Sequence, residues 1–267
     1  MGSTMVSTHP YLDAPMAVAI AHRGSAATFP ENTMAAFQDA VDLGYRYIET
    51  DVHTTLDGVL VAFHDDRLDR VTNRKGLISE LTWAEIAQAK VHGREAIPRF
   101  DELLAAWPEL RINIDPKADD AVGLLITALK QPRVLARVCV GSFSGARLNH
   151  MRDALGPDLC TSMAPVDVAR LRLNSLGLPV GRFRALAAQV PLRQYGLPIV
   201  DKLFVDKAHS RGLKVHVWTI NDQATMERLL DLGVDGIMSD ETALLKAVYQ
   251  DRGLWPDELE TTNDQIR

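Results

Sequence analysis

The sequence predicts a (β/α)8 barrel, and three observations favour this fold class. Short apolar, β-branched runs alternate with amphipathic segments of helical length along most of the 267 residues. Strict alternation of this kind is typical of a parallel sheet, because parallel strands need a helical crossover. Eight such pairs can be counted, which is the number that closes a barrel. A doubly wound sheet remains the alternative, because one sequence does not reveal strand order.

The elements can be assigned in chain order. The predicted strands are Val18–Ala21, Tyr47–Val52, Arg111–Asp115, Val138–Ser142, Leu159–Met163, Ala185–Val190, Lys214–Trp218 and Gly236–Ser239. The predicted helices are Thr33–Leu43, Phe100–Ala106, Ala118–Leu129, Gly145–Ala154, Val166–Asn174, Lys202–Arg211, Gln223–Leu232 and Glu241–Tyr249. Asn32 or Thr33 would cap the first helix, and Gly44 stands where its C-terminal cap belongs.

One segment breaks the alternation. The stretch YIETDVHTTLDGVLVAFHDD contains two strand-like runs joined at Asp57-Gly58, a sequence that favours a tight two-residue turn. Two strands joined so closely must be antiparallel. Counting back from that turn pairs Val52 with Phe63 and Asp51 with His64. We therefore expect the hairpin to carry His64 to the level of Asp51.

The chain divides into a barrel and three additions. We expect an N-terminal extension over 1–16, the barrel over 17–249 with an insertion at about 65–99, and a polar C-terminal tail over 250–267. The N-terminus lacks the basic start and apolar run of a secretory signal. No run approaches the ~20 apolar residues that a membrane helix needs. We therefore expect a cytoplasmic protein without stable membrane insertion.

Composition excludes other classes of protein. The formal net charge of −6 argues against a non-specific nucleic-acid binder, which usually carries a basic face. Only two cysteines are present, so a disulfide scaffold is excluded by count. Cys139 lies in the apolar run RVCVGSF, and we expect it to be a buried free thiol.

Polar side chains gather where the predicted strands end. In a parallel barrel the chemistry takes place at the carboxyl ends of the strands. Those ends supply His22, Arg23, Glu49, Asp51, Asp115, Lys117, Ser142, Trp218 and Asn221, and the hairpin adds His64. The strand pattern fixes these positions before the identity of the residues is considered, so their convergence indicates a functional site.

The carboxylates among them suit a metal ion. Glu49 and Asp51 are two residues apart on one strand and point to the same face. Asp115, on another barrel strand, could add a third carboxylate. Ligands that are all oxygen favour Mg²⁺ or Ca²⁺ over zinc. The alternative is that these acids are solvated or simply pair with Arg23 and Lys117.

The remaining residues suit phosphate chemistry. His22 and His64 are candidates for proton transfer near neutral pH. Arg23 and Lys117 could hold a phosphate or balance the acidic charge. Trp218 could form a wall for an apolar or glycerol-like group, or belong to the barrel core. A metal, two histidines and two cations together point to hydrolysis of a phosphate ester.

The sequence resembles the glycerophosphodiester phosphodiesterase family. The motifs that carry the resemblance are AHRG at 21–24, PENT at 30–33, IETDVHTTLDGVLVAFHD at 48–65, LDRVTNRKG at 68–76, IPRFDELL at 97–104, NIDPK at 113–117, WTIN at 218–221 and DGIMSD at 235–240. The match runs from about Ala19 to Leu245. The long block that ends in His64-Asp65, taken with HRG and PENT, is its most specific part.

The resemblance implies a (β/α)8 barrel that cleaves glycerophosphodiesters to an alcohol and glycerol 3-phosphate. It implies His22 as general base and His64 as general acid, with Arg23 and Lys117 holding the phosphate. A glycerol hydroxyl of the substrate would act as internal nucleophile, and the cyclic phosphate so formed would then be hydrolysed. The implied partner is therefore a small-molecule substrate.

The resemblance also implies one bound Mg²⁺ or Ca²⁺, held by Glu49, Asp51 and Asp115. The sequence departs from the family at one of these ligands. The family usually has Glu-x-Lys where this chain has Asp115-Pro116-Lys117, so the carboxylate is one methylene shorter. This departure bears on the affinity and choice of metal more than on the class of reaction.

Two other functions remain as alternatives. A phospholipase D-type activity on lysophospholipids or sphingolipids would need an apolar surface near the barrel mouth, and the mostly polar insertion at 65–99 does not offer one. A non-catalytic barrel that binds phosphorylated ligands is the second alternative. The presence of both histidines and all three carboxylates argues against it.

Overall fold

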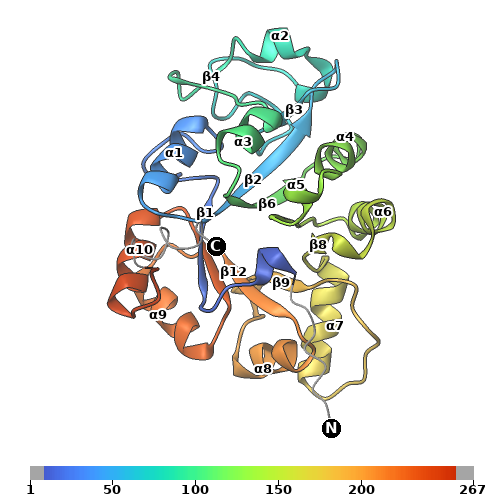
Figure 1. Ribbon diagram of the computed structural model, residues 1–267, viewed down its shortest axis with the longest axis vertical. Helices are drawn as coiled ribbons and strands as arrows, with labels where there is room; N and C mark the ends of the chain where they lie inside the picture. Colours follow the sequence, from blue (N-terminus) through green and yellow to red (C-terminus); the bar gives the residue numbers. More distant parts are fainter. Residues whose placement is uncertain (1–8, 257–267) are drawn as a thin grey trace, which may run out of the picture.

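Eight parallel strands follow one another around a barrel in the computed structural model, which describes residues 9–256 (Figure 1). Their order is β8-β7-β6-β2-β1-β13-β12-β9, and a bridge from Ser162 to Ala187 joins the two end strands. The strands are β1 (Val18–His22), β2 (Tyr47–Thr54), β6 (Arg111–Pro116), β7 (Val138–Val140), β8 (Cys160–Thr161), β9 (Ala187–Pro191), β12 (Lys214–Trp218) and β13 (Gly236–Ser239). The predicted fold class and all eight predicted strands are confirmed.

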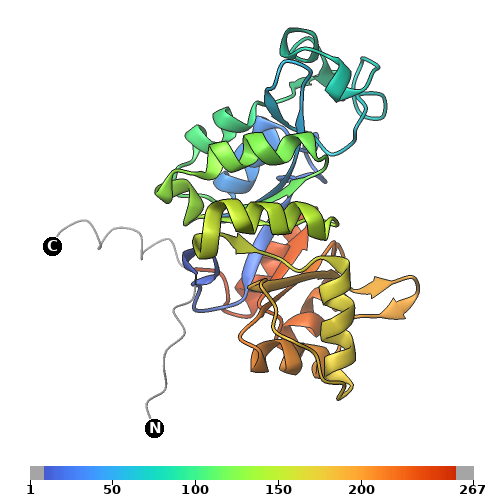
Figure 2. The same ribbon diagram turned by 90° about the vertical axis from the view of Figure 1, so that its right-hand side faces the viewer.

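Helices surround the barrel and bury their apolar faces against the strands (Figures 1 and 2). They are α1 (Met34–Asp42), α3 (Phe100–Ala106), α4 (Asp120–Leu129), α5 (Pro132–Leu135), α6 (Gly145–Leu155), α7 (Pro165–Ser175), α8 (Lys202–Ser210), α9 (Gln223–Leu232) and α10 (Thr242–Asp251). The eight predicted helices are confirmed to within two residues at each end, and the short α5 was not predicted. Thr33 caps α1 by accepting a hydrogen bond from the backbone N of Ala36 at 3.3 Å.

The hairpin after β2 forms as predicted, but its predicted register is wrong by one residue. Val52 pairs with Ala62 rather than with Phe63. The predicted pairing of Asp51 with His64 is wrong for the same reason, since the backbone carbonyl of Asp51 accepts from the N of Phe63 at 3.0 Å. His64 nevertheless comes to the carboxylates, because it follows directly after the hairpin.

A three-residue loop explains the shift in register. The backbone N of Thr55 donates to the carbonyl of Val59 at 3.0 Å, so the loop contains Leu56, Asp57 and Gly58 instead of two residues. Gly58 has a φ of +80° and takes the left-handed position that ends such a turn. The side chain of Thr55 also accepts from the N of Val59 at 3.0 Å, which stabilises the longer loop.

The insertion that follows this hairpin is a small lobe with its own core. Its elements, with the returning strand, are β3 (Leu60–Ala62), η2 (Ile78–Glu80), α2 (Trp83–Ile86), β4 (Lys90–Val91) and β5 (Glu95–Ala96). Its buried apolar cluster consists of Val61, Phe63, Leu68, Val71, Ile78, Ile86, Ala89, Val91 and Ile97. The lobe stands at one side of the barrel mouth, at the top of Figure 2.

A second hairpin, absent from the sequence-based prediction, stands beside the same mouth. It consists of β10 (Arg193–Gln194) and β11 (Leu197–Pro198) and follows β9. Figure 2 shows it projecting from the barrel on the side opposite η1 (Pro10–Leu12). The mouth therefore lies between the insertion and this hairpin.

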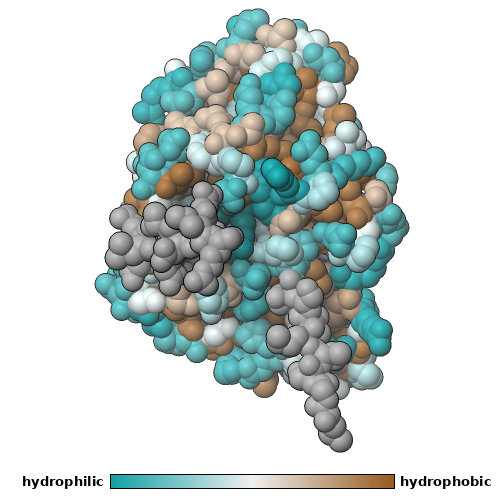
Figure 3. All heavy atoms as spheres, in the orientation of Figure 1, coloured by the Kyte–Doolittle hydropathy of each residue, from teal (hydrophilic) through white to brown (hydrophobic). Residues whose placement is uncertain are grey.

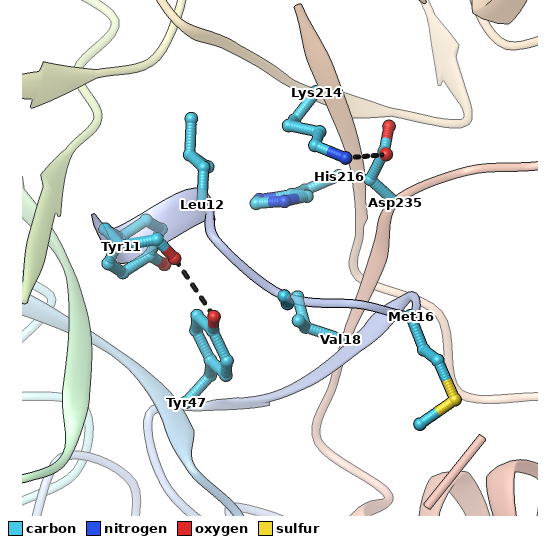
Figure 4. A pocket seen from close by; sticks show the side chains of 9 residues that line it. Tyr11, Leu12, Met16, Val18, Tyr47, Lys214, His216 and Asp235 are labelled. Atoms are coloured by element: carbon cyan, nitrogen blue, oxygen red, sulfur yellow. Dashed lines mark hydrogen bonds and ion pairs between the residues drawn. The ribbon is translucent and has the colours of Figure 1, made fainter. Parts of the chain in front are cut away.

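The amino end of the barrel is closed by η1. Tyr11 is fully buried there, and its ring meets the ring of Tyr47 at 5.4 Å between centroids. The hydroxyl of Tyr47 donates to the backbone carbonyl of Tyr11 at 3.0 Å (Figure 4). The pocket left beside them measures about 10 Å³, which is room for about one water molecule. The surface on this side is mostly hydrophilic (Figure 3).

The predicted terminal segments are described only in part. Residues 1–8 of the predicted extension and 257–267 of the predicted tail lie outside the described residues. Within the described part, Trp255 packs edge-on against Tyr45, with 5.0 Å between ring centroids. Cys139 and Cys160 are both buried and free, as predicted for Cys139. No helix within residues 9–256 is long and apolar enough to cross a membrane.

Candidate active site

A cavity of about 640 Å³ opens at the carboxyl ends of the barrel strands. The eight residues that the sequence predicts for catalysis, metal binding and substrate contact all line it: His22, Arg23, Glu49, Asp51, His64, Asp115, Lys117 and Trp218. Ser142 lines the same cavity. The structure therefore brings the predicted residues together at one place, and their roles remain proposals.

The turn after β1 places Arg23 at the cavity. Arg23 and Gly24 both have left-handed backbone, with φ of 58° and 78°. A Cβ on Gly24 would lie 2.6 Å from the carbonyl carbon of Ala36, so the close approach of α1 also requires glycine here. The backbone N of Arg23 donates to the carbonyl of Glu49 at 3.0 Å, which fixes this turn to β2.

Lys117 lies between two of the carboxylates. Asp51 and Asp115 pair across β2 and β6, and the Nζ of Lys117 lies 2.7 Å from Asp51 Oδ1 and 2.8 Å from Asp115 Oδ2. Burial raises the pKa of Asp51, but the charges of Lys117 and Arg23 outweigh it and hold that pKa below its usual range. Burial dominates at Asp115 and raises its pKa.

Glu49 is the carboxylate whose charge is least compensated. Burial, and then the charge of Asp51, raise the pKa of Glu49 to about 7. Its Oε2 lies 3.7 Å from the Nε2 of His22 and accepts from the backbone N of Arg23 at 3.3 Å. A cation beside Glu49 would compensate its negative charge and lower its pKa.

The donor set suits a hard divalent cation such as Mg²⁺ or Ca²⁺ by its chemistry, although its side chains are not arranged around one point. Three carboxylates from two adjacent strands, Glu49, Asp51 and Asp115, supply only oxygen, and the raised pKa of Glu49 indicates room for further positive charge. In the part of the chain that the structure describes, no three acidic, histidine or cysteine side chains converge on one point closely enough to hold a metal. The ammonium group of Lys117 fills the space between Asp51 and Asp115.

His22 is oriented by a carboxylate at the end of β13. Its Nδ1 lies 2.7 Å from Asp240 Oδ1, and Asp240 Oδ2 accepts from the Nδ2 of Asn221 at 2.8 Å. Burial alone lowers the pKa of His22, but Glu49 and then Asp240 outweigh it, and the pKa is raised. Burial raises the pKa of Asp240, yet His22 outweighs it and holds that pKa low. The ionised Asp240 accepts a hydrogen bond from the Nδ1–H of His22, so Nε2 is the ring nitrogen that can take up a proton.

The sequence interpretation missed Asp240, although a signal was available. Asp240 directly follows a predicted strand, as the chosen residues do, and it closes the motif DGIMSD. Asn221, after the end of β12, does not cap the helix that follows it. Asp222 caps α9 by accepting from the N of Thr225 at 2.9 Å, whereas Asn221 holds Asp240.

His64 has an equivalent arrangement at the other side of the charged cluster. Its Nδ1 lies 2.7 Å from Asp65 Oδ1, and Asp65 Oδ2 accepts from the Nε of Arg70 at 2.6 Å. Arg70 also donates to Glu31 at 2.7 Å, and Glu31 accepts from Arg23 at 3.1 Å. Hydrogen bonds therefore connect the partner of His64 with the arginine that follows His22.

Asn32 supports the carboxylates and does not cap the helix. Its Nδ2 donates to Asp51 Oδ2 at 3.0 Å, and its Oδ1 accepts from the hydroxyl of Thr50 at 2.8 Å. Its left-handed φ of 56° aims the side chain away from α1 and toward β2. The cap is Thr33, so only the second of the two predicted alternatives is confirmed.

The other half of the cavity is mostly apolar. Its apolar lining residues are Phe143, Met163, Pro165, Val168, Ala169, Pro191, Tyr195, Leu197, Ile199, Trp218 and Met238. Polar side chains from the same strands and loops complete the lining: Ser142, Ser162, Gln189, Gln194 and Thr219. The rings of Phe143 and Trp218 meet edge to face, with 5.9 Å between centroids. The sequence interpretation looked for an apolar surface only in the insertion, and the structure places one across the mouth from it.

The comparisons with known proteins identify relatives along most of the chain. The model of the glycerophosphoryl diester phosphodiesterase family matches residues 22–244. A probable glycerophosphodiester phosphodiesterase of Mycobacterium tuberculosis is 36% identical over 244 residues, which are 89% of this chain and 92% of the relative.

Two further relatives bear on substrates. A phosphodiesterase of Oleispira antarctica, solved in complex with the product sn-glycerol-3-phosphate, has a TM-score of 0.72 and 25% identity, covering 88% of this chain and 97% of that one. An enzyme named lysophospholipase D from Rattus norvegicus is 28% identical and covers 85% of this chain and 84% of its own.

Proposed function

Since this chain belongs to the glycerophosphoryl diester phosphodiesterase family and is therefore a phosphoric diester hydrolase, we propose that the charged half of its cavity cleaves glycerophosphodiesters to an alcohol and glycerol 3-phosphate. The observation that carries this proposal is the convergence of the predicted histidines, carboxylates and cations on one cavity. The product complex of the Oleispira antarctica enzyme supports the same choice of substrate.

The two histidines are the proposed proton carriers. Asp240 holds Nδ1 of His22, and Asp65 holds Nδ1 of His64, so each ring keeps its Nε2 for the substrate. His22 acts as general base and takes the proton of the attacking hydroxyl. His64 acts as general acid and gives a proton to the leaving alcohol. The raised pKa of His22 makes it a stronger base near neutral pH.

Arg23 and Lys117 are the proposed phosphate contacts. The guanidinium of Arg23 lies between Glu31 and Asp51, and Lys117 lies between Asp51 and Asp115, so both cations are held at the cavity by acids. Glu49, Asp51 and Asp115 would hold one Mg²⁺ or Ca²⁺. The bound ion would neutralise charge on the phosphate oxygens. We also propose that the protein works in the cytoplasm, as its sequence predicts.

A product assay tests the proposed reaction. Purified protein is incubated with glycerophosphocholine, and glycerol 3-phosphate and choline are measured after chelation and after add-back of Mg²⁺ or Ca²⁺. We expect both products, loss of activity with chelator, and recovery with one of the ions. Formation of phosphocholine and glycerol instead would overturn the proposed bond cleavage, and activity indifferent to chelator would overturn the metal role.

The apolar half of the cavity favours a second candidate function. It provides the apolar surface at the mouth that phospholipase D-type hydrolysis of lysophospholipids requires, and the relative from Rattus norvegicus carries that name. An acyl chain could lie along Phe143, Tyr195 and Leu197 while the phosphate lies among the cations. The same assay with lysophosphatidylcholine separates the two: release of choline at a higher kcat/KM than from glycerophosphocholine would favour the second function.

A further inference from the structure

The tip of the β10–β11 hairpin carries an aromatic side chain that the hairpin does not need. Tyr195 is 94% exposed, and it forms a two-residue turn with Gly196 in which both φ angles are positive, 49° and 79°. Such turns favour asparagine or glycine, because a left-handed backbone strains other residues by about 1 kcal/mol. The tyrosine therefore costs stability at this position without packing against the rest of the protein.

Three further apolar side chains stand exposed at the same end of the barrel. Leu197 in the hairpin is 68% exposed, Phe143 in the loop after β7 is 62% exposed, and Val166 in the first turn of α7 is 71% exposed. Tyr195, Leu197 and Phe143 also line the cavity. We call these four residues the apolar lip. The apolar lip continues the apolar half of the cavity outward and forms one side of its opening.

The hairpin of the lip carries positive charge, in contrast to the protein as a whole. Residues 168–200 contain arginine at 170, 172, 182, 184 and 193 and no acidic residue, although the net charge of the protein is −6. Arg182 and Arg184 precede β9 and lie toward the amino end of the barrel, so Arg193 in the hairpin is the arginine beside the lip. Three of these arginines pair with acids elsewhere, whereas Arg182 and Arg193 have no acidic partner among residues 9–256. Arg193 is exposed and donates to the carbonyl of Gly196 at 2.8 Å, which holds its charge at the hairpin tip.

We propose that the apolar lip docks on the surface of a membrane that contains anionic phospholipid. Tyrosine favours the boundary between lipid and water, where its ring is buried and its hydroxyl stays hydrated. Leu197 would enter beside it, and Arg193 would lie at the lipid phosphates. A projecting hairpin tip offers little area to a flat protein partner, but a lipid surface can close around it. Docking in this way turns the opening of the cavity toward the membrane.

Co-sedimentation with lipid vesicles tests the docking without any turnover. We expect the protein to bind vesicles of phosphatidylcholine with phosphatidylglycerol more tightly than vesicles of phosphatidylcholine alone, and to lose this difference at high salt. Tyr195→Asn supplies the residue that the turn prefers, so the variant should unfold at the same or a higher temperature than the wild type. We expect it to bind vesicles about tenfold more weakly.

Two further variants make the test specific. Arg193→Gln should weaken binding to the anionic vesicles about fivefold and leave binding to phosphatidylcholine unchanged. Leu56→Asn is the matched control, because Leu56 is a 63%-exposed residue at the tip of the other hairpin beside the mouth. It should bind vesicles as the wild type does.

Several outcomes would overturn the proposal. One is a wild type that co-sediments with neither vesicle, and another is a loss of binding in Leu56→Asn as large as that in Tyr195→Asn. A dimer in sedimentation velocity that disappears in Tyr195→Asn, without vesicle binding by the wild type, would show that a second copy covers the lip. Because binding is measured without substrate, these results stand apart from the outcome of the product assay.

Discussion

The two halves of the cavity are built by different means. In the charged half, short strands and the β2–β3 hairpin hold acids, histidines and cations in a network of ion pairs, so each side chain has partners that fix it. In the apolar half, side chains of β9, β12 and β13 are joined by others from loops, the start of α7 and the β10–β11 hairpin, and several of these are exposed. From this comparison we expect the reaction to depend on the fixed side chains of the charged half, and substrate selection to depend on the more exposed side chains of the apolar half.

The largest expected effect is the loss of turnover when a histidine of the charged half is removed. We expect His22→Ala and His64→Ala each to lower turnover of glycerophosphocholine about 10³-fold, because each variant loses a proton carrier. Circular dichroism and thermal unfolding should match the wild type, and His150→Ala, on the exposed face of α6, serves as control. Near-normal turnover in both variants would contradict the acid–base roles.

Asp240 is expected to act through His22. Asp240→Asn should lower turnover about 10²-fold, because His22 loses the acceptor that orients it. Asp240 contributes to the raised pKa of His22, so its removal lowers that pKa. A base with a lower pKa stays neutral in more acidic solution, and the acid limb of the pH–rate profile should therefore move to lower pH.

The control for Asp240 is a second acid in the same region. Asp222→Asn removes one negative charge nearby and keeps a residue that can cap α9. It should leave both the rate and the pH profile unchanged. An unshifted profile in Asp240→Asn would show that Asp240 has only a structural role.

The apolar half should respond in KM and not in kcat. Phe143→Ala removes an exposed ring that faces the cavity, so we expect the KM for lysophosphatidylcholine to rise about fivefold. The KM for glycerophosphoglycerol, which has no apolar group to place there, should not change. Equal changes in KM for both substrates would contradict a role of Phe143 in binding the apolar group.

The smallest expected effect concerns the length of one carboxylate. Asp115→Glu should change the concentration of Mg²⁺ or Ca²⁺ needed for half-maximal activity by a few-fold, because the longer side chain alters the spacing of the ligands. Metal titration of both proteins measures it, with Asp119→Glu, whose side chain is 88% exposed, as control. An identical titration for Asp115→Glu would argue against Asp115 as a ligand.

The charged half could be predicted from the sequence because strand patterns locate it. The run Val18–His22 ends in a histidine whatever the details of its packing, and the same holds for the carboxylates of β2. The predictions that failed concern details that the strand pattern does not determine. The register of the hairpin depends on a hydrogen bond made by the side chain of Thr55, and the link between Asp240 and His22 joins residues 218 positions apart.

The apolar half was missed for a physical reason. Its most exposed side chains, Phe143, Tyr195 and Leu197, come from short segments that have neither the period of a strand nor that of a helix, so no local pattern marks them. Met163, Trp218 and Met238 do lie on predicted strands, but the strand pattern alone does not show that they face a cavity. The stretch RQYGLP contains a hairpin of two-residue strands, and its turn carries tyrosine where asparagine is usual. Because the turn lacks its usual residue, the sequence does not indicate a turn there.

The buried Tyr11 beneath the barrel has a consequence for the order of events. Because η1 closes the amino end, the described part of the barrel opens at the carboxyl ends of its strands. In the proposed reaction, substrate, both products and the water that completes hydrolysis would all pass this opening. In the proposed reaction we therefore expect the alcohol to leave before water takes its place at the phosphate, and glycerol 3-phosphate to depart last, because the cations would hold its phosphate.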